Sequence, residues 1–327
     1  MTEAAISSES SEVRESFRTG KASIEHKLGV CMGTSSLEPA DQAELLVILS
    51  KDSDKRIAER AASALQIVPV EAFVAALTRS DAAPQLFEYC RENFIQKPEI
   101  ARALIGNLGC PIHSTIDALI RLPDEEVKAF ADDLGLLSIR PELGAALLSS
   151  TALSPDQRRL LEELEHGGAP PNIELLAEAV KDAEEDPTKR ESLLQRLAKM
   201  RVTERMQLAF KGGREERMAL IRDSARLVQR AVMQSPKLTE REVEGFASIT
   251  SLTEEVLRLI ATGRSYRKNY TIAKNLCFNP KTPLDVSLHL LVRIHTPDLK
   301  TLTNNKNIPE TLRTTALKFF RQRTTER

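Results

Sequence analysis

The stretch Asn279–Arg293, NPKTPLDVSLHLLVR, contains a polar turn followed by an amphipathic segment. Asparagine at the end of a helix tolerates a turn and bonds to nearby backbone, whereas proline suits the first position of the next helix because it has no N–H to leave unpaired. After Pro283, Leu288 and Leu291 recur at helical spacing. The stretch therefore predicts the end of one helix, a short loop and the start of another.

The same kind of turn recurs along the chain, each time as an apolar helix end, a polar loop and a capping residue or proline. Successive copies begin 43, 85, 44 and 26 residues apart, which fits one unit of about 43 residues with one copy missed and a shorter last copy. Two-helix HEAT and armadillo repeats have roughly this length, about 40–47 residues. The copies are Asn107–Pro111, Ser150–Ser154, Ser235–Thr239, Asn279–Pro283 and Asn305–Pro309.

The composition supports a helical fold. Hydrophobic residues make up 41% of the 327 residues, but aromatic residues only 4%, and there is no tryptophan. A core with so few rings must be filled by Leu, Ala, Ile and Val, which suits close packing of helices better than a β-sandwich. Thirteen glycines also leave little material for many tight hairpins. We therefore expect an all-α protein.

The Asn279–Pro283 turn and the helix after it resemble the bacterial leucine-rich repeat variant and HEAT-like helical repeat families. The resemblance is best over Ile221–Phe320 and weaker over Leu49–Leu164. It implies an α-solenoid of two-helix repeats that serves as an interaction surface. Some members of the variant family hold an iron–sulfur cluster on clustered N-terminal cysteines. Because only Cys31 lies near the start of this sequence, that feature does not carry over and we expect no cofactor.

Composition also varies along the chain and predicts four segments. Residues 1–36 are rich in Ser, Glu and Thr and predict a mobile N-terminal arm with at most one short helix. Residues 37–165 predict an acidic helical repeat array. Residues 166–190 begin with HGGAPPN, a strong interruption of any helix, and predict an acidic junction. Residues 191–327 predict a basic, HEAT-like array.

The net charge of −1 conceals a marked asymmetry. Residues 201–327 carry 24 Lys and Arg against 13 Asp and Glu, a net charge of +11, so residues 1–200 carry −12. Such asymmetry is typical of a protein with an anionic partner. Alternatively, the acidic half folds back on the basic half and masks it.

The sequence predicts a cytoplasmic protein. The four cysteines are too scattered for a disulfide framework or a zinc knuckle, which favours a reducing compartment. The N-terminal residues lack the apolar core of a signal peptide, and no run reaches the roughly 18 apolar residues of a membrane span.

No arrangement of residues indicates catalysis or a metal site. The chain contains no GxxxxGK[ST], HExxH, GxSxG or CxxC motif. Cys110 and His113 share one turn, but two ligands cannot make a structural zinc site, which needs four. We therefore expect a protein that is not an enzyme and has no metal.

Arginines recur every four residues at the start of the Ile221–Phe320 region and predict one cationic stripe on a helix. A shift by the repeat length of 44 leads to two tyrosines and a lysine, so equivalent helices would place both sets on adjacent ridges of one surface. Three further cations add positive charge to this surface. The candidate residues are Arg222, Arg226, Arg230, Arg264, Tyr266, Arg267, Lys268, Tyr270 and Lys274.

Two interpretations of this surface remain open. In the structural one, the arginines bridge neighbouring helices and pair with Asp223, Glu242 or Glu254. In the functional one, guanidinium groups and tyrosine rings meet an anionic partner. The favoured hypothesis is a scaffold or adaptor that binds an acidic helix or tail of another protein. The alternative is a nucleic-acid-binding protein, because cations interleaved with aromatic side chains also suit phosphates and bases.

Overall fold

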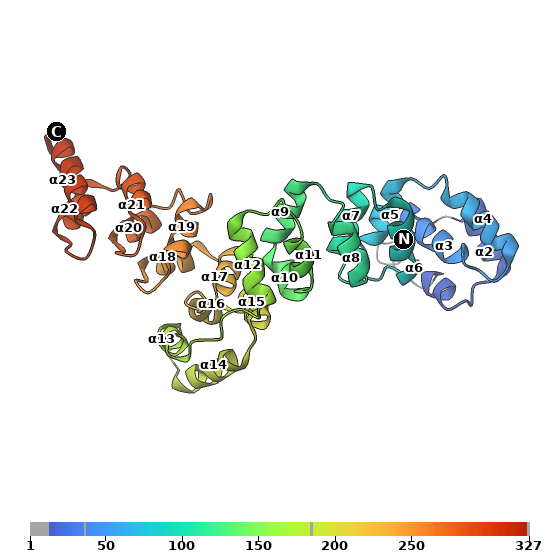
Figure 1. Ribbon diagram of the computed structural model, residues 1–327, viewed down its shortest axis with the longest axis horizontal. Helices are drawn as coiled ribbons and strands as arrows, with labels where there is room; N and C mark the ends of the chain where they lie inside the picture. The colour runs from blue at the N-terminus through green and yellow to red at the C-terminus, as the bar shows by residue number, and fades with distance from the viewer. Residues whose placement is uncertain (1–12, 36, 184–185, 326–327) are drawn as a thin grey trace, which may run out of the picture. The chain divides into compact units, whose positions relative to one another are not determined.

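The computed structural model describes residues 13–35, 37–183 and 186–325 (Figure 1). Every regular element in these ranges is a helix, and none of these residues forms a strand. Most helices are short, commonly two to three turns. The all-α fold expected from the low aromatic and glycine content is therefore confirmed.

The helices form two compact units whose division lies between residues 129 and 154. Unit 1 comprises residues 1–129 and 145–153, and unit 2 comprises residues 130–144 and 154–327. The division passes through two helices, α9 (Asp124–Asp132) and α11 (Leu143–Leu148). It does not fall at the glycine- and proline-rich residues 166–190, where the sequence predicted a junction.

The first described residues of unit 1, 13–18, are helical. The helices that follow are α2 (Ile24–Met32), α3 (Pro39–Leu49), α4 (Lys55–Leu65), α5 (Val70–Leu77), α6 (Pro84–Phe94), α7 (Pro98–Gly106) and α8 (Ile112–Leu119). Three of them start with proline at their first position, where its missing N–H costs nothing. Several helices pack on the next but one, namely α2 on α4, α3 on α5, α5 on α7 and α6 on α8, and α3 also packs on α4 and α7 on α8.

Unit 2 contains α10 (Leu134–Ile139) and a long run of helices from α12 onwards. Their bounds are α12 (Pro155–Glu165), α13 (Ile173–Ala183), α14 (Pro187–Lys199), α15 (Val202–Lys211), α16 (Arg214–Leu220), α17 (Arg226–Gln234), α18 (Glu240–Ser248), α19 (Glu254–Thr262), α20 (Tyr270–Phe278), α21 (Leu284–Leu291), α22 (Thr296–Asn304) and α23 (Glu310–Thr325). Ser154 and Thr239, expected to begin helices, each form a capping box with the residue three positions on.

The later helices of unit 2 alternate between two rows. Helix α18 packs against α16 and α20, and α19 packs against α17, whereas α21 packs against α23. We call α16, α18, α20 and α22 the even row, and α17, α19, α21 and α23 the odd row. Starts within the odd row lie 28, 30 and 26 residues apart, and starts within the even row lie 26, 30 and 26 apart. The helix pair therefore repeats about every 28 residues.

This period corrects the unit of about 43 residues expected from the turns. An offset of 44 residues leads from α17 to α20, across three helices, and so from one row to the other. The alternation agrees with the prediction of two helices per repeat, but the predicted length of the repeat was wrong. The error arose because equivalent turns follow helices of both rows, and their residue types do not distinguish the rows.

The Asn279 turn, which follows α20, joins that helix to α18, the preceding helix of the even row. The Asn279 side-chain amide donates to the carbonyls of Ala247 (3.0 Å) and Ile249 (2.9 Å) at the end of α18, while its Oδ1 accepts from the N–H of Lys281 (3.0 Å). Carbonyls in the last turn of a helix have no partner within the helix. The turn that sequence analysis singled out therefore also caps the preceding helix of the even row.

Asn107 makes the same set of contacts in unit 1. Its amide donates to the carbonyls of Leu77 and Arg79 after α5, and its Oδ1 accepts from the N–H of Gly109. At Asn305 only the local bond is present, from the N–H of Asn307 to Oδ1 (2.9 Å). The inter-helix bonds thus mark those copies of the turn that link two repeats.

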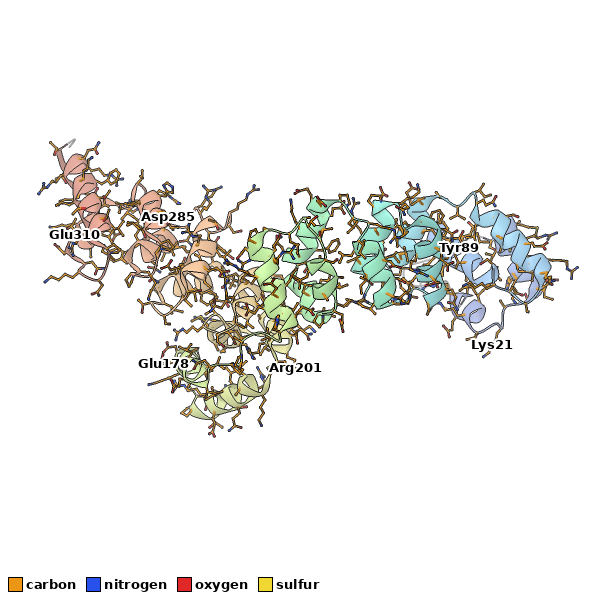
Figure 2. The ribbon with its side chains drawn as sticks, viewed as in Figure 1. Lys21, Tyr89, Glu178, Arg201, Asp285 and Glu310 are labelled. Atoms are coloured by element: carbon orange, nitrogen blue, oxygen red, sulfur yellow. The ribbon has the colours of Figure 1, made fainter. Side chains whose placement is uncertain are left out.

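Ion pairs also connect neighbouring repeats, and the cation comes first in the chain. Lys27 and Asp52 are 2.7 Å apart, Arg217 and Glu242 2.9 Å, and Arg258 and Asp285 2.7 Å (Asp285 is labelled in Figure 2). In each of these pairs the carboxylate follows the cation by 25 to 27 residues, which is close to the length of one helix pair. We call these contacts rungs.

The Lys27–Asp52 rung predicts a dependence of stability on pH. The hydrogen bond from Lys27, together with that from the N–H of Asp54, holds the pKa of Asp52 below its ordinary value. The unfolded chain then takes up a proton at higher pH than the folded chain. The stabilisation is present above the ordinary carboxyl pKa and is lost as pH falls through the lowered value.

We expect Asp52→Asn to lose less stability than the wild type on acidification, as measured by urea denaturation from pH 6 to pH 3. Glu71→Gln is the control and should follow the wild type, because the Glu71 side chain is exposed and none of the described residues pairs with it. Equal acid sensitivity of Asp52→Asn and the wild type would contradict this interpretation of the rung.

Residues 13–35 correct the prediction of a mobile arm with at most one short helix. Residues 13–18 and α2 are both helical, and Phe17 and Val30 are buried. Arg14 and Arg18 also form ion pairs with carboxylates of α3. The Ser, Glu and Thr composition concealed this packing because a short helix needs few apolar side chains. Residues 1–12 and 36 of the predicted arm lie outside the described residues.

The glycine- and proline-rich stretch ends α12, as expected, but it packs within unit 2. Gly168 has φ +65° and lies so close to Val202 that an added Cβ would come within 2.4 Å of the valine. Arg205 donates to the carbonyl of Ala169 (2.9 Å), and Ser224 donates to that of Pro170 (2.6 Å). These bonds hold the stretch against α15 and the loop before α17, so it lies within unit 2 and does not separate two arrays.

Candidate functional site

The three arginines of the predicted stripe lie at the start of the odd row. Arg222 is in the loop before α17, Arg226 is the first residue of that helix, and Arg230 is one turn further on. The spacing of four residues thus produces the expected alignment for Arg226 and Arg230. Their charge, however, is directed at carboxylates of the same unit.

Arg226 and Arg230 share two carboxylates. The Nε of Arg226 lies 2.6 Å from one oxygen of Glu255 on α19, and the Nε of Arg230 lies 2.5 Å from the other. Both arginines also face Asp156 on α12, at 3.7 Å from Arg226. Burial alone would lower the pKa of Arg230, but the charges of Asp156 and Glu255 raise it overall. This part of the stripe is neutralised within unit 2.

Arg222 is likewise paired. Its Nη1 lies 2.7 Å from Asp182 on α13, and only 12% of its side chain is exposed. The structural interpretation therefore describes the arginines well, although the partners differ from those expected. Asp223 pairs with Arg205 and Glu242 with Arg217, because those arginines lie directly beside them in the unit.

Tyr270 and Lys274 lie in α20, in the even row. The Tyr270 hydroxyl donates to Asp298 and accepts from the N–H of His295 (3.1 Å), and the two rings have centroids 4.1 Å apart. Lys274 lies 2.8 Å from the same Asp298. Tyr270 and Lys274 thus form a rung to α22, much as Arg226 and Arg230 do to α19.

The structure does not place the arginine stripe and the tyrosines on adjacent ridges. Helix α17 packs against α15 and α19, whereas α20 packs against α18, α19 and α21. The two sets of side chains belong to equivalent rungs in different rows. Asp156, Glu255 and Asp298 complete these rungs but were not predicted from the sequence. For Glu255 and Asp298, the available signal was a carboxylate that follows a cation by 24 to 29 residues.

The remaining predicted cations lie in the connection between α19 and α20. Arg264, Arg267 and Lys268 are exposed, and their side chains have no hydrogen-bond or ion-pair partner among the described residues. We call residues 263–268 the basic loop. In contrast to the paired stripe, it presents to solvent three positive charges that form no direct ion pair with the described residues.

The basic loop is held in place by its own backbone and by α21. Tyr266 and Arg267 both donate their N–H groups to the carbonyl of Gly263 (3.1 Å each). The Tyr266 ring lies so close to Gly263 that an added Cβ would come within 2.6 Å of it. Arg293, which follows α21, donates to the carbonyl of Arg267. These contacts fix the position from which the three cations project.

Tyr266 itself is only half-buried. Burial raises the pKa of its hydroxyl, and the nearby charges of Glu240 and Glu242 raise it further. The ring therefore contributes a neutral, partly exposed surface beside the three cations. A ring and guanidinium groups in one loop can contact an anionic chain through both charge and stacking.

Within the described ranges, no group of three or more His, Cys, Asp or Glu side chains is placed to hold a metal ion. The four cysteines are free, and burial raises the pKa of the Cys277 thiol to about 12. No single described helix is long and apolar enough to cross a membrane, although α4 and α5 meet the criterion as a pair bent by 107°.

No protein-family model matches the chain, and neither a curated protein nor a solved structure shows a match. The resemblance to leucine-rich repeat variant and HEAT-like proteins therefore stays a prediction.

Proposed function

We propose that the protein is a non-enzymatic scaffold that binds an acidic segment of another protein through the basic loop of unit 2. The observation that carries the proposal is the difference between two groups of cations. Arg222, Arg226 and Arg230 are neutralised by carboxylates of the same unit. Arg264, Arg267 and Lys268 are exposed and have no side-chain partner within the part of the chain that the structure describes.

The form of the loop supports an extended acidic tail as ligand. Its cations project from one short connection whose backbone is fixed by Gly263 and Arg293. Guanidinium groups pair well with carboxylates in two-point contacts. Because these cations are exposed, binding depends on long-range attraction and weakens as salt rises.

The test compares two triple variants of the full chain that change the charge equally. The loop variant carries Arg264→Glu, Arg267→Glu and Lys268→Glu. The control carries Lys281→Glu, Lys300→Glu and Lys306→Glu, which replace exposed lysines elsewhere in unit 2 whose side chains have no partner in the described ranges. We expect the loop variant to bind a short fluorescent peptide of Glu and Asp at least about tenfold more weakly than the wild type, and the control less than about threefold, by anisotropy at low salt.

Equal losses in both variants would contradict recognition by the basic loop and would indicate a diffuse charge effect. Nucleic-acid binding, the alternative class, rests on the same positive charge. It predicts retardation of a single-stranded oligonucleotide with a steep salt dependence, because phosphate contacts release counterions. Binding of the oligonucleotide in preference to the acidic peptide would replace the proposed function.

A further inference from the structure

Two carboxylates of α3 lie one turn apart and are almost completely withdrawn from water. Asp41 and Glu44 are 2% and 0% exposed. Buried carboxylates are stable only with cations and hydrogen-bond donors close by. Arg79, between α5 and α6, contacts both of them. The remaining cations come from residues 13–18, which we call the N-terminal helix.

Two arginines of the N-terminal helix complete the site. The Nη1 of Arg14 lies 2.6 Å from Asp41 and its Nη2 lies 2.8 Å from Asp81. The Nε of Arg18 lies 3.1 Å from Glu44, and its guanidinium also donates to the carbonyl of Asp81. We call Asp41, Glu44 and Asp81 the arginine slot, because they receive two guanidinium groups from positions i and i+4 of one helix.

The N-terminal helix follows the same spacing as the rungs. Arg14 precedes Asp41 by 27 residues, and Arg18 precedes Glu44 by 26, as in the rungs of both units. The helix therefore occupies the place of a preceding repeat. What the slot holds is a pair of arginines on successive turns of a helix, and the Phe17 ring between them is buried as well.

Apart from these ion pairs, the described residues of the N-terminal helix bury little apolar surface. Phe17 is its one buried apolar side chain, and Val13 is 37% exposed. It is joined to α2 by a short connection in which Gly20 has φ +71°. Segments with little buried apolar surface open at low free energy. The slot, in contrast, is built on α3, whose residues Leu45, Leu46 and Val47 are 0% exposed.

We propose that the arginine slot is a binding site for a basic amphipathic helix of another protein, with the pattern Arg-x-x-Phe-Arg, and that the N-terminal helix occupies it as a displaceable competitor. The partner helix replaces two guanidinium groups and one ring, so the buried carboxylates keep their cations during the exchange. The proposal concerns unit 1 and a basic ligand, and it is independent of the basic loop of unit 2.

The test uses the full chain and a fluorescent peptide with the sequence of residues 13–21. An opened variant carries Arg14→Ala, Phe17→Ala and Arg18→Ala. The control is Lys21→Ala, because the Lys21 side chain, labelled in Figure 2, is exposed and unpaired beside the helix. We expect the opened variant to bind the peptide at least about tenfold more tightly than the wild type or the control do, and a peptide with both arginines replaced by alanine not to bind.

Absence of binding to an opened variant that keeps its helical circular dichroism would overturn the proposal, as would equal binding to the wild type. Hydrogen exchange of the wild type is the second measurement, in case the opened variant does not fold. The amides of residues 17 and 18 should exchange much faster than those of residues 45–47 in α3. Equal protection would show that the N-terminal helix opens only with the whole unit, and this too would overturn the proposal.

Discussion

Replacing Arg205 by alanine is expected to lower the free energy of unfolding by about 3–5 kcal/mol, because the change leaves a buried carboxylate without its cation. Arg205 and Asp223 are 1% and 0% exposed at their side chains, with 2.8 Å between the nearest nitrogen and oxygen. Arg205 also donates to the carbonyls of Met200 (2.8 Å) and Ala169 (2.9 Å). One side chain thus connects α15, the glycine–proline stretch and the loop before α17.

The measurement is urea denaturation of the full chain, followed by circular dichroism. Arg201→Ala is the matched control, since Arg201 precedes the same helix and is labelled in Figure 2 at an exposed position. In its ion pair with Glu204, the Arg201 side chain is 82% exposed. Exposed ion pairs contribute little to the free energy of unfolding. A loss for Arg205→Ala as small as that for Arg201→Ala would show that the buried pair does not hold unit 2 together.

Replacing Asn279 by alanine is expected to cost about 2–4 kcal/mol, the second-largest effect. The change removes two hydrogen bonds to the carbonyls of Ala247 and Ile249 and leaves a largely buried helix end without donors. It also removes the local bond from the N–H of Lys281. The loss should be visible as a lower midpoint in thermal and urea denaturation.

Two further variants separate the local turn from the inter-helix link. Asn305→Ala removes only the local bond to Asn307, and it should cost less than about 1 kcal/mol. Asn279→Asp keeps an acceptor for the turn but loses both donors, so it should resemble Asn279→Ala. If Asn279→Asp is instead as stable as the wild type, the link to α18 contributes nothing and the turn alone explains the asparagine.

The sequence identified part of the candidate site. Arg264, Arg267 and Lys268 were recognised as extra charge around the stripe, and they are exposed and unpaired. Arg222, Arg226 and Arg230 were placed at the centre of the surface because of their regular spacing. The same spacing aligns Arg226 and Arg230 with Glu255, so regularity indicated a structural rung as readily as a binding surface.

The sequence by itself determined the helices and the turns between them. Asn279 and Pro283, the capping residues Ser154 and Thr239, and the low aromatic content act through bonds and packing within a few residues. Helical periodicity and turn chemistry are local properties, and they can be recognised without knowledge of the neighbours.

Only the tertiary structure decided which helices lie side by side and which charges are neutralised by ion pairs within the unit. Arg226 and Tyr270 would be equivalent only if the 44 residues between them spanned an even number of helices. They span three, from α17 to α20, so Tyr270 lies in the other row. Whether a cation is free depends on a carboxylate about one helix pair away in the sequence, or as far away as Asp156 is from Arg230. Stacking brings such side chains within a few ångströms, and no local pattern specifies that distance.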